Sequence, residues 1–424
     1  MKLKKVLAMA LAVSMILAVP GCGSSEEAKE GGDKEATGSL EFWNDKYAQK
    51  DQSDIDKMIE SIEGLSNTDM EVVAYPDTAS YQTAMQQSIK GEDAPGLFTW
   101  WSGPQLETLA KNGLVEDLTD IWDEYIEANG VSPDIADALS VDGKIVAAPY
   151  SVIYNAVIYN THVLEDNSLE VPETFDEFLD LCETLKSKGI TPIGLKNDSW
   201  AGFIWFQQLL AAKNPQLYLD VCNGTKPYTD PEVIEVMNIW KDMLDKGYFT
   251  APMTIMDMKK ELATGKTAMF LEPNYEAVNL EKEFDVKCGE DISTFVLPTM
   301  TDDVKKVVFF EVAPLCVSTN SKDKDAAMEV MKKWFTKEHQ TVLTETDGNV
   351  NTSEVEVNNA VVNKMIEYSQ DTENYSMILR YYENTPSEIR DIALDQFMKF
   401  QMGNADVDEV VNTIQEKADE IFAK

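Results

Sequence analysis

Residues 70–101 read MEVVAYPDTASYQTAMQQSIKGEDAPGLFTWW, and this stretch predicts the fold. The β-formers of residues 70–75 indicate a strand that ends at Pro76. A helix is expected over residues 81–90, and after a break containing Gly and Pro the fully apolar residues 97–101 form the next strand. A strand, a helix and a strand in succession are typical of a parallel α/β sheet covered by helices.

The same alternation continues on both sides of this unit. Upstream, residues 39–44 (SLEFWN) read as a strand and residues 53–65 as an amphipathic helix. Downstream, a turn leads into a helix over residues 105–112. Because ligands bind at the carboxyl ends of strands in such sheets, Trp43-Asn44 and Trp100–Ser102 are the first candidates for a site.

The rest of the chain repeats these elements without a repeat of fixed period. Thr174 and Glu177 have the spacing of a capping box at the start of a helix. Further strands are expected at 145–150, 152–159 and 265–271, and further helices at 201–212, 231–245, 323–335, 355–368, 386–402 and 406–422.

The first 22 residues predict export from the cytoplasm. A basic start at residues 2–5 precedes the apolar run Val6–Val19, which is a signal-peptide pattern and is too short for a membrane span of about 20 residues. Cys22 at the cut resembles the lipidated cysteine of a bacterial lipobox, although an ordinary signal peptide with an incidental cysteine is the alternative. We therefore expect a signal peptide over 1–21 and a lipidated flexible tether over 22–38.

The composition excludes some partners. A formal net charge of −39 argues against nucleic-acid binding and against attraction to anionic lipids. An apolar fraction of 44% supports a large core, and the length after the tether favours two lobes over a single core.

Cysteine and histidine give no sign of metal or nucleophilic chemistry. Cys182, Cys222, Cys288 and Cys316 lack CxxC spacing, which argues against zinc. Buried free thiols are expected, with disulfides as the alternative outside the cell. His162 and His339 have no motif of a Ser–His–Asp site around them and are predicted to be surface residues.

Several blocks together resemble one family. These are Gly91–Phe98 (GEDAPGLF), Leu109–Leu118 (LAKNGLVEDL), Asp142–Lys144 with Pro149-Tyr150, Tyr159-Asn160, Val171–Phe178 (VPETFDEF), Lys188–Ile193 (KGITPI) and Gly265–Phe270 (GKTAMF). In this order they resemble the family 1 extracellular solute-binding proteins, which are carbohydrate-binding lipoproteins of ABC transporters. Gly96 departs from the usual Asp of the first block.

The resemblance implies a two-lobed, periplasmic-binding-protein-like α/β fold with the ligand cleft between the lobes. Three crossover segments are expected near residues 150, 308 and 348. The first lobe would comprise 39–149 and 309–347, and the second 150–308 and 348–424. The family further implies a monomer without a cofactor that presents its ligand to permease subunits and performs no chemistry.

A sugar site needs aromatic rings for the apolar faces of a pyranose and carboxylates or amides for its hydroxyls. Trp101 is preferred to its strand neighbour Trp100, while Trp205, Trp240 and Trp334 are assigned to the core. The predicted ligand contacts are Trp43, Asn44, Trp101, Ser102, Tyr150, Asp198, Trp200, Asn274, Tyr275, Glu311 and Tyr381. Their number favours an oligosaccharide.

Two other functions stay open at this point. A lipid-anchored glycoside hydrolase would need two carboxylates about 5–10 Å apart, and a chain this acidic offers many uninformative pairs. A binding protein for a non-sugar solute such as a polyamine would use the same carboxylates and aromatic rings through cation–π contacts.

Overall fold

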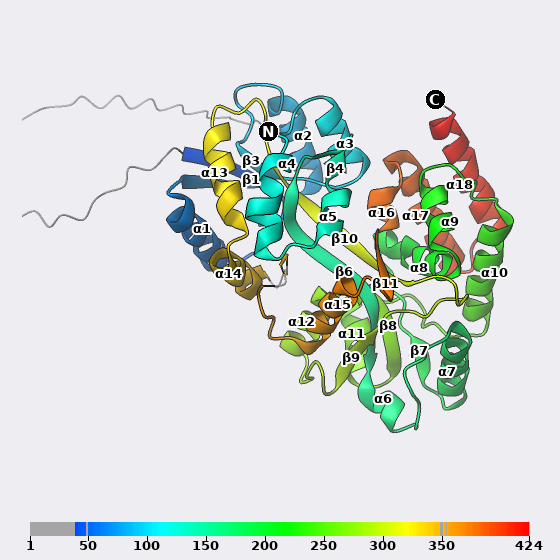
Figure 1. The fold of residues 1–424 in the computed structure, drawn as a ribbon. Coiled ribbons are helices and arrows are strands. Elements are labelled where there is room, and N and C mark those ends of the chain that lie inside the picture. The colour runs from blue at the N-terminus through cyan, green and yellow to red at the C-terminus, as the bar shows by residue number, and fades with distance from the viewer. Residues whose placement is uncertain (1–38, 48–49, 348–350, 353, 424) are drawn as a thin grey trace, which may run out of the picture. The chain divides into compact units, whose positions relative to one another are not determined.

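The computed structural model describes residues 39–47, 50–347, 351–352 and 354–423, which form a mixed α/β structure (Figure 1). The predicted signal peptide, the tether and Cys22 lie outside the described residues. Within the described part of the chain, every helix is too short or too polar to span a bilayer.

Nine strands form the main sheet, in the order β2-β1-β3-β10-β6-β8-β7, with β9 beside β6 and β11 beside β10. The strands of this sheet are β1 (Ser39–Asn44), β2 (Asp69–Ala74), β3 (Leu97–Thr99), β6 (Ala148–Asn160), β7 (Thr191–Ile193), β8 (Thr267–Pro273), β9 (Ile292–Phe295), β10 (Lys306–Val317) and β11 (Tyr375–Leu379). A separate hairpin pairs β4 (Ser140–Val141) with β5 (Lys144–Ile145).

The expectation of a parallel sheet is correct at the two ends of the sheet and for β11, which pairs in parallel with β10. β1 pairs in parallel with β2 and β3, as the first unit predicts, and β7 pairs in parallel with β8. The two long central strands are antiparallel to each other. β6 also pairs antiparallel with β8, and β10 pairs antiparallel with β3. The sheet is therefore mixed. Figure 1 shows both strands running through the middle of the fold.

Helices cover the sheet. The α-helices are α1 (Gln52–Ser66), α2 (Thr78–Ser88), α3 (Pro104–Lys111), α4 (Thr119–Ile121), α5 (Pro133–Ala138), α6 (Thr161–Glu165), α7 (Phe175–Ser187), α8 (Ile204–Lys213), α9 (Pro215–Cys222), α10 (Pro231–Asp245), α11 (Ile255–Ala263), α12 (Tyr275–Glu283), α13 (Lys324–Trp334), α14 (Lys337–Asp347), α15 (Ala360–Gln370), α16 (Tyr381–Asn384), α17 (Ser387–Gln401) and α18 (Val407–Phe422). Within the described residues there are also a π-helix, η1 (Trp122–Ile126), and two 3-10 helices, η2 (Glu127–Asn129) and η3 (Ser199–Phe203). The capping box is confirmed, since Thr174 accepts from the Glu177 amide and Glu177 accepts from the Thr174 amide.

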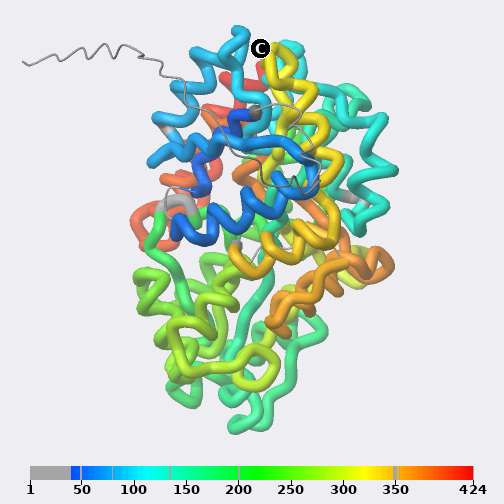
Figure 2. Tube along the Cα trace, turned by 90° about the vertical axis from the view of Figure 1, so that its left-hand side faces the viewer, coloured from blue at the N-terminus to red at the C-terminus, as the bar shows by residue number. Residues whose placement is uncertain are grey.

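The apolar residues form two core clusters, and the first extends from the helices around β1–β3 to Met258 of α11 and Leu280 of α12. Trp334 lies in the first core, and Trp205 and Trp240 lie in the second, as the sequence predicts. Segments that are distant in sequence share these cores. α13 and α14 pack on α1, and Figure 2 shows this yellow part of the chain beside the blue α1.

The chain segments predicted as crossovers are hydrogen-bonded together. Val152 of β6 is the direct partner of Val312 of β10. Asn351 donates to the Tyr150 carbonyl at 2.8 Å and accepts from the Val152 amide at 3.0 Å. The predicted lobe boundaries remain predictions.

One histidine prediction is wrong. His339 is fully buried on α14, where its ring lies 4.7 Å from that of Trp334 and its Nδ1 is 3.1 Å from the Ser61 hydroxyl. The packing of α14 on α1 removes this ring from solvent, which no local pattern reveals. His162 is exposed, as predicted.

The four cysteines within the described residues are free thiols. Cys182, Cys222 and Cys316 are buried, and Cys288 is half-buried. Burial raises the pKa of each thiol, so these sulfurs are held in the unreactive form.

Candidate functional site

The two central strands reach the surface at one cross-strand pair. Along β6 every residue is buried except Ile153, and along β10 only Lys306 at its start and Glu311 are partly exposed. Ile153 and Glu311 are direct partners in the antiparallel register, so they share one face of the sheet. The side chain of Glu311 keeps 22% of its surface exposed. The middle of the sheet is therefore exposed to solvent at this pair.

Arg380 fixes the carboxylate of Glu311. This buried residue lies between β11 and α16, and its Nη2 is 2.7 Å from Glu311 Oε2. The same guanidinium donates twice to Glu383, from Nη2 at 2.7 Å and from Nε at 3.0 Å. Burial opposes the charge of Arg380, but the carboxylates of Glu311 and Glu383 outweigh burial and raise its pKa. Arg380 therefore stays charged and is shared between two acids.

Tyr275 belongs to the same neighbourhood. It begins α12 directly after β8 and is half-buried. Burial raises the pKa of its phenol, and the nearby charges of Glu272, Glu276 and Glu311 raise it further. Tyr275 therefore offers a neutral hydroxyl and an aromatic ring close to Glu311.

The preceding Asn274 has a structural role. Its backbone amide donates to the Tyr154 carbonyl at 2.8 Å, and its side-chain oxygen accepts from the Tyr154 backbone amide at 3.2 Å. These bonds tie the start of α12 to β6, and they commit the side-chain oxygen of Asn274.

Two further polar side chains lie buried nearby. Glu272 is the cross-strand partner of Ala156, so it lies on the opposite face of the sheet from Ile153. Burial raises the pKa of Glu272 to about 8, although Lys196 Nζ at 3.8 Å favours the ionised form. Asn155 shares the face of Ile153 and is buried, and neither its Oδ1 nor its Nδ2 has a hydrogen-bond partner.

Two partly exposed tryptophans lie at the ends of β1 and β3. Trp43 ends β1, with its ring 5.4 Å from that of Tyr75 and its Nε1 donating to Glu41 at 2.8 Å. Trp101 follows β3 and packs its ring 4.9 Å from that of Trp100. Trp101 is partly exposed whereas Trp100 is buried, which is the arrangement that the sequence favours.

Their polar neighbours are buried. Asn44 Oδ1 accepts from the backbone amides of Lys46 and Tyr47, so it shapes the turn after β1. Ser102 is 2% exposed, and its hydroxyl has no hydrogen-bond partner.

The loop after β3 meets α16 at Gly103. This residue has φ +71°, and a Cβ there would lie 1.9 Å from the carbonyl oxygen of Glu383. Beside this contact is a cavity of about 340 Å³ whose walls include Gly103 and Glu107 on one side and Leu379 and Glu383 on the other. The structure therefore brings the Trp101–Gly103 loop next to Glu383, one of the two acids bonded to Arg380.

Two predicted contacts lie in the cores instead. Tyr150 is buried against Phe42 and Trp334, and Tyr381 is buried with its hydroxyl 2.6 Å from that of Tyr228. The sequence places Tyr150 near a crossover and Tyr381 in a late loop, but it does not give the direction of either ring. Large aromatic rings are readily buried. Neither ring offers a face to a ligand in this structure.

The last two predicted contacts follow β7. Asp198 is exposed before η3, and its side chain makes no capping bond there. Trp200 lies within η3, and its side chain is outside the part of the structure that is described.

Sequence reasoning missed Ile153, Arg380 and Glu383. Ile153 looks like any strand residue, and only the register with Glu311 distinguishes it. The available signal was that Arg380 directly precedes Tyr381, a predicted contact, because a guanidinium commonly pairs with carboxylates.

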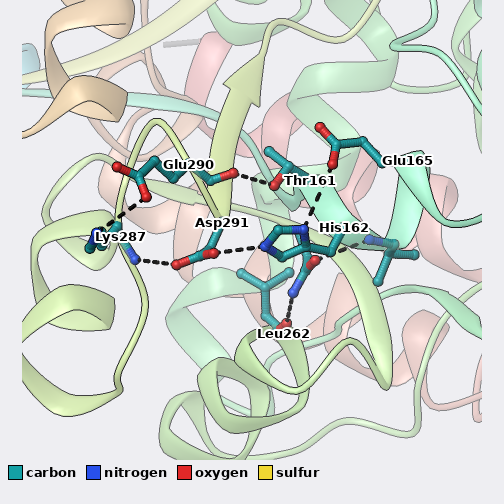
Figure 3. A network of polar contacts seen from close by, with 9 residues as sticks. Thr161, His162, Glu165, Leu262, Lys287, Glu290 and Asp291 are labelled. Atoms are coloured by element: carbon teal, nitrogen blue, oxygen red, sulfur yellow. Dashed lines mark hydrogen bonds and ion pairs between the residues drawn. The ribbon is translucent and has the colours of Figure 1, made fainter.

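The His162 network does not form a catalytic triad. His162 Nε2 is 2.7 Å from Asp291 Oδ1, and its Nδ1 is 3.7 Å from Glu165 (Figure 3). The adjacent Thr161 hydroxyl donates to the Glu290 carbonyl at 2.5 Å instead of to the imidazole. The network ties α6 to the 287–291 loop. Within the described residues, no cluster of His, Cys, Asp and Glu could hold a metal ion.

Comparison with known proteins identifies the family. The family of bacterial extracellular solute-binding proteins matches residues 57–370. The diacetylchitobiose-binding protein DasA of Streptomyces coelicolor is 24% identical over 357 residues, which cover 82% of this chain and 81% of that protein.

Solved structures share the fold. A bacterial solute receptor, AcbH, described as preferring β-D-galactopyranose, superposes with a TM-score of 0.78 at 19% identity, covering 91% of this chain and 99% of the receptor. A chitin oligosaccharide binding protein superposes with a TM-score of 0.76 at 20% identity, with the same coverage. The match over most of the chain, together with the two-lobed fold built on β6 and β10, shows that the protein belongs to the family of bacterial extracellular solute-binding proteins.

Proposed function

We propose that the protein captures an oligosaccharide outside the cytoplasmic membrane and delivers it unchanged to the permease of an ABC importer. One observation carries the proposal: Glu311, opposite Ile153, is the partly exposed residue in the middle of the buried strands β6 and β10, and its charge acts on Tyr275. DasA, named for binding diacetylchitobiose, supports the class of ligand.

The chemistry of these residues suits a sugar. The rings of Trp43, Trp101 and Tyr275 offer apolar area for the C–H faces of a pyranose. Glu311 accepts hydrogen bonds from hydroxyls, and Asp198 and Trp200 extend the proposed site after β7.

The proposed mechanism is closure of the two lobes around the ligand. Trp43 and Trp101 belong to the proposed first lobe, 39–149 with 309–347, and Tyr275 and Trp200 to the proposed second lobe, 150–308 with 348–424. A ligand that touches both lobes binds the closed state better, so it shifts the population toward closure. The closed form would then present both lobes to the permease.

Calorimetry with a panel of neutral oligosaccharides tests this function. The panel includes N,N′-diacetylchitobiose and galacto-, xylo- and malto-oligosaccharides, and each mixture is analysed for shorter products after incubation. We expect saturable binding of at least one member and no product. Steady release of shorter sugars would identify a hydrolase, and the absence of any saccharide binding would reject the proposal.

We further propose that lipid on Cys22 anchors the protein to the outer face of the cytoplasmic membrane. Stable anchoring requires more than one acyl chain, which a lipidated N-terminal cysteine supplies. Cys22→Ala is expected to release the protein into the medium without changing its ligand affinity. Fractionation of cells expressing either form checks this, and a variant that stays with the membrane would contradict it.

A further inference from the structure

Around the Ile153–Glu311 pair, carboxylates outnumber the positively charged groups. Arg380 carries one positive charge and is bonded to the carboxylates of both Glu311 and Glu383. The single positive charge of Arg380 is thus shared by two carboxylates.

Two lysines near the proposed contacts also have acidic neighbours. Lys46 Nζ is 3.2 Å from Asp45 and 5.5 Å from the centre of the Trp101 ring. Lys196 Nζ is 3.8 Å from Glu272, which lies on the opposite face of the sheet from Ile153. Arg380 and Lys46 each have a carboxylate beside them.

We propose that Glu311, held in place by Arg380, is a specificity-determining residue that selects uncharged saccharides and rejects those carrying carboxylates. This inference rests on the proposed function and names the chemical class of its ligand. Arg380 acts as a positioning residue, because it engages Glu311 Oε2 and directs the partly exposed carboxylate.

The physical reason is the direction of the hydrogen bonds. A sugar hydroxyl donates to a carboxylate, whereas a uronate carboxylate has no proton to donate and brings a like charge. A free arginine would bind a uronate bidentately, but both Nε and Nη2 of Arg380 already donate to Glu383. Rejection of the acidic sugar thus comes from a built-in repulsive group.

A second observation points to a neutral polar ligand. Asn155 lies on the same sheet face, two residues from Ile153, and is 1% exposed. Its amide has both a donor and an acceptor without hydrogen-bond partners. A hydroxyl can both donate and accept, so it satisfies such an amide, while a carboxylate can only accept.

The experiment compares galacturonate oligosaccharides with their neutral galactose counterparts and with the other neutral sugars of the panel. Affinities are measured by calorimetry for the full mature protein at low and at high salt. We expect each neutral ligand that binds to exceed its uronate counterpart by about 100-fold or more, with the ratio falling as salt screens the repulsion.

Three variants separate charge from packing. Glu311→Gln keeps the shape and removes the charge, so the neutral-to-uronate ratio is expected to fall by about tenfold or more. Glu311→Asp keeps the charge and is expected to retain the discrimination. Glu60→Gln, on the exposed face of α1, makes the same change of net charge away from the site and should leave the ratio unchanged. Thermal melts verify that each variant is folded.

The outcomes are distinct. Equal binding of a neutral sugar and its uronate by the unmodified protein would overturn this inference alone, as would an unchanged ratio in Glu311→Gln or a lost ratio in Glu60→Gln. Loss of discrimination in Glu311→Asp would show that position rather than charge matters, and would also overturn it. Absence of binding by every saccharide would overturn the proposed function and this inference with it.

Discussion

Ile153 and Glu311 are direct cross-strand partners, and each is the partly exposed residue in the middle of a buried strand. An apolar and a charged side chain thus stand side by side where β6 and β10 reach the surface. This pair combines apolar area with a strong acceptor, which is the combination that a saccharide requires. The predictions below concern the groups that surround it.

Trp101→Ala is expected to weaken binding of a panel oligosaccharide by about 1–3 kcal/mol while the protein remains folded, because the exposed part of its ring offers apolar area to a sugar. Trp240→Ala is the contrast, since that ring is fully buried and its loss is expected to destabilise the fold by about 3–5 kcal/mol. Calorimetry and chemical denaturation measure the two effects. An unchanged affinity in Trp101→Ala would show that this ring is structural.

Gly103→Ala is expected to separate the Trp101–Gly103 loop from α16. The added Cβ would meet the Glu383 carbonyl oxygen at 1.9 Å, and a backbone atom cannot move aside cheaply. Gly113→Ala is the matched control, because Gly113 has a similar φ of +66° with nothing within 4 Å. Both variants bear the backbone cost of about 1 kcal/mol, and only Gly103→Ala bears the clash.

Denaturation and calorimetry compare these two glycine variants. A larger loss of stability or of ligand affinity in Gly103→Ala is the expected result. Equal behaviour of the two variants would mean that the contact between the loop and α16 is absent in solution.

Arg380→Met is expected to lower the free energy of unfolding by about 3–5 kcal/mol, because it leaves Glu311 and Glu383 without their shared cation in a largely buried place. Lys144→Met removes an exposed cation 3.0 Å from Asp117 and is expected to cost less than about 1 kcal/mol. Urea denaturation measures both. Similar losses would show that solvent already screens the Arg380 pairs.

The buried His339 is expected to make stability depend on pH. Burial lowers its pKa to about 3, whereas the unfolded side chain titrates near about 6.5. Between these values the unfolded chain binds a proton that the folded chain does not, so stability falls as pH falls below about 6.5, by up to about 1.4 kcal/mol per pH unit.

His339→Phe keeps a ring against Trp334 and should remove this slope between about pH 5 and 6.5, where most carboxylates are still ionised. His162→Gln is the control. A hydrogen bond to Asp291 raises the pKa of His162, so its contribution is lost as pH rises and has the opposite sign. A slope that persists in His339→Phe would assign the effect to other groups.

Local patterns predicted much of the fold. The strand–helix–strand run of residues 70–101, the Thr174–Glu177 capping box and the burial of Trp240 all follow from periodicity and caps that act within a few residues. Of the candidate site, the sequence pointed to Trp43, Trp101, Tyr275 and Glu311, which the structure leaves partly exposed at strand ends or in the middle of β10.

The sequence by itself determined the α/β class, the family blocks and the positions of most helices, because these depend on interactions between near neighbours. Only the tertiary structure decided the antiparallel pairing of β6 with β10, the burial of Tyr150, Tyr381 and His339, and the sharing of Arg380 by Glu311 and Glu383. Each of these depends on strand register or on helix packing between distant segments. A shift of one residue in that register would turn Glu311 to the other face, so the site exists only once the whole sheet is assembled.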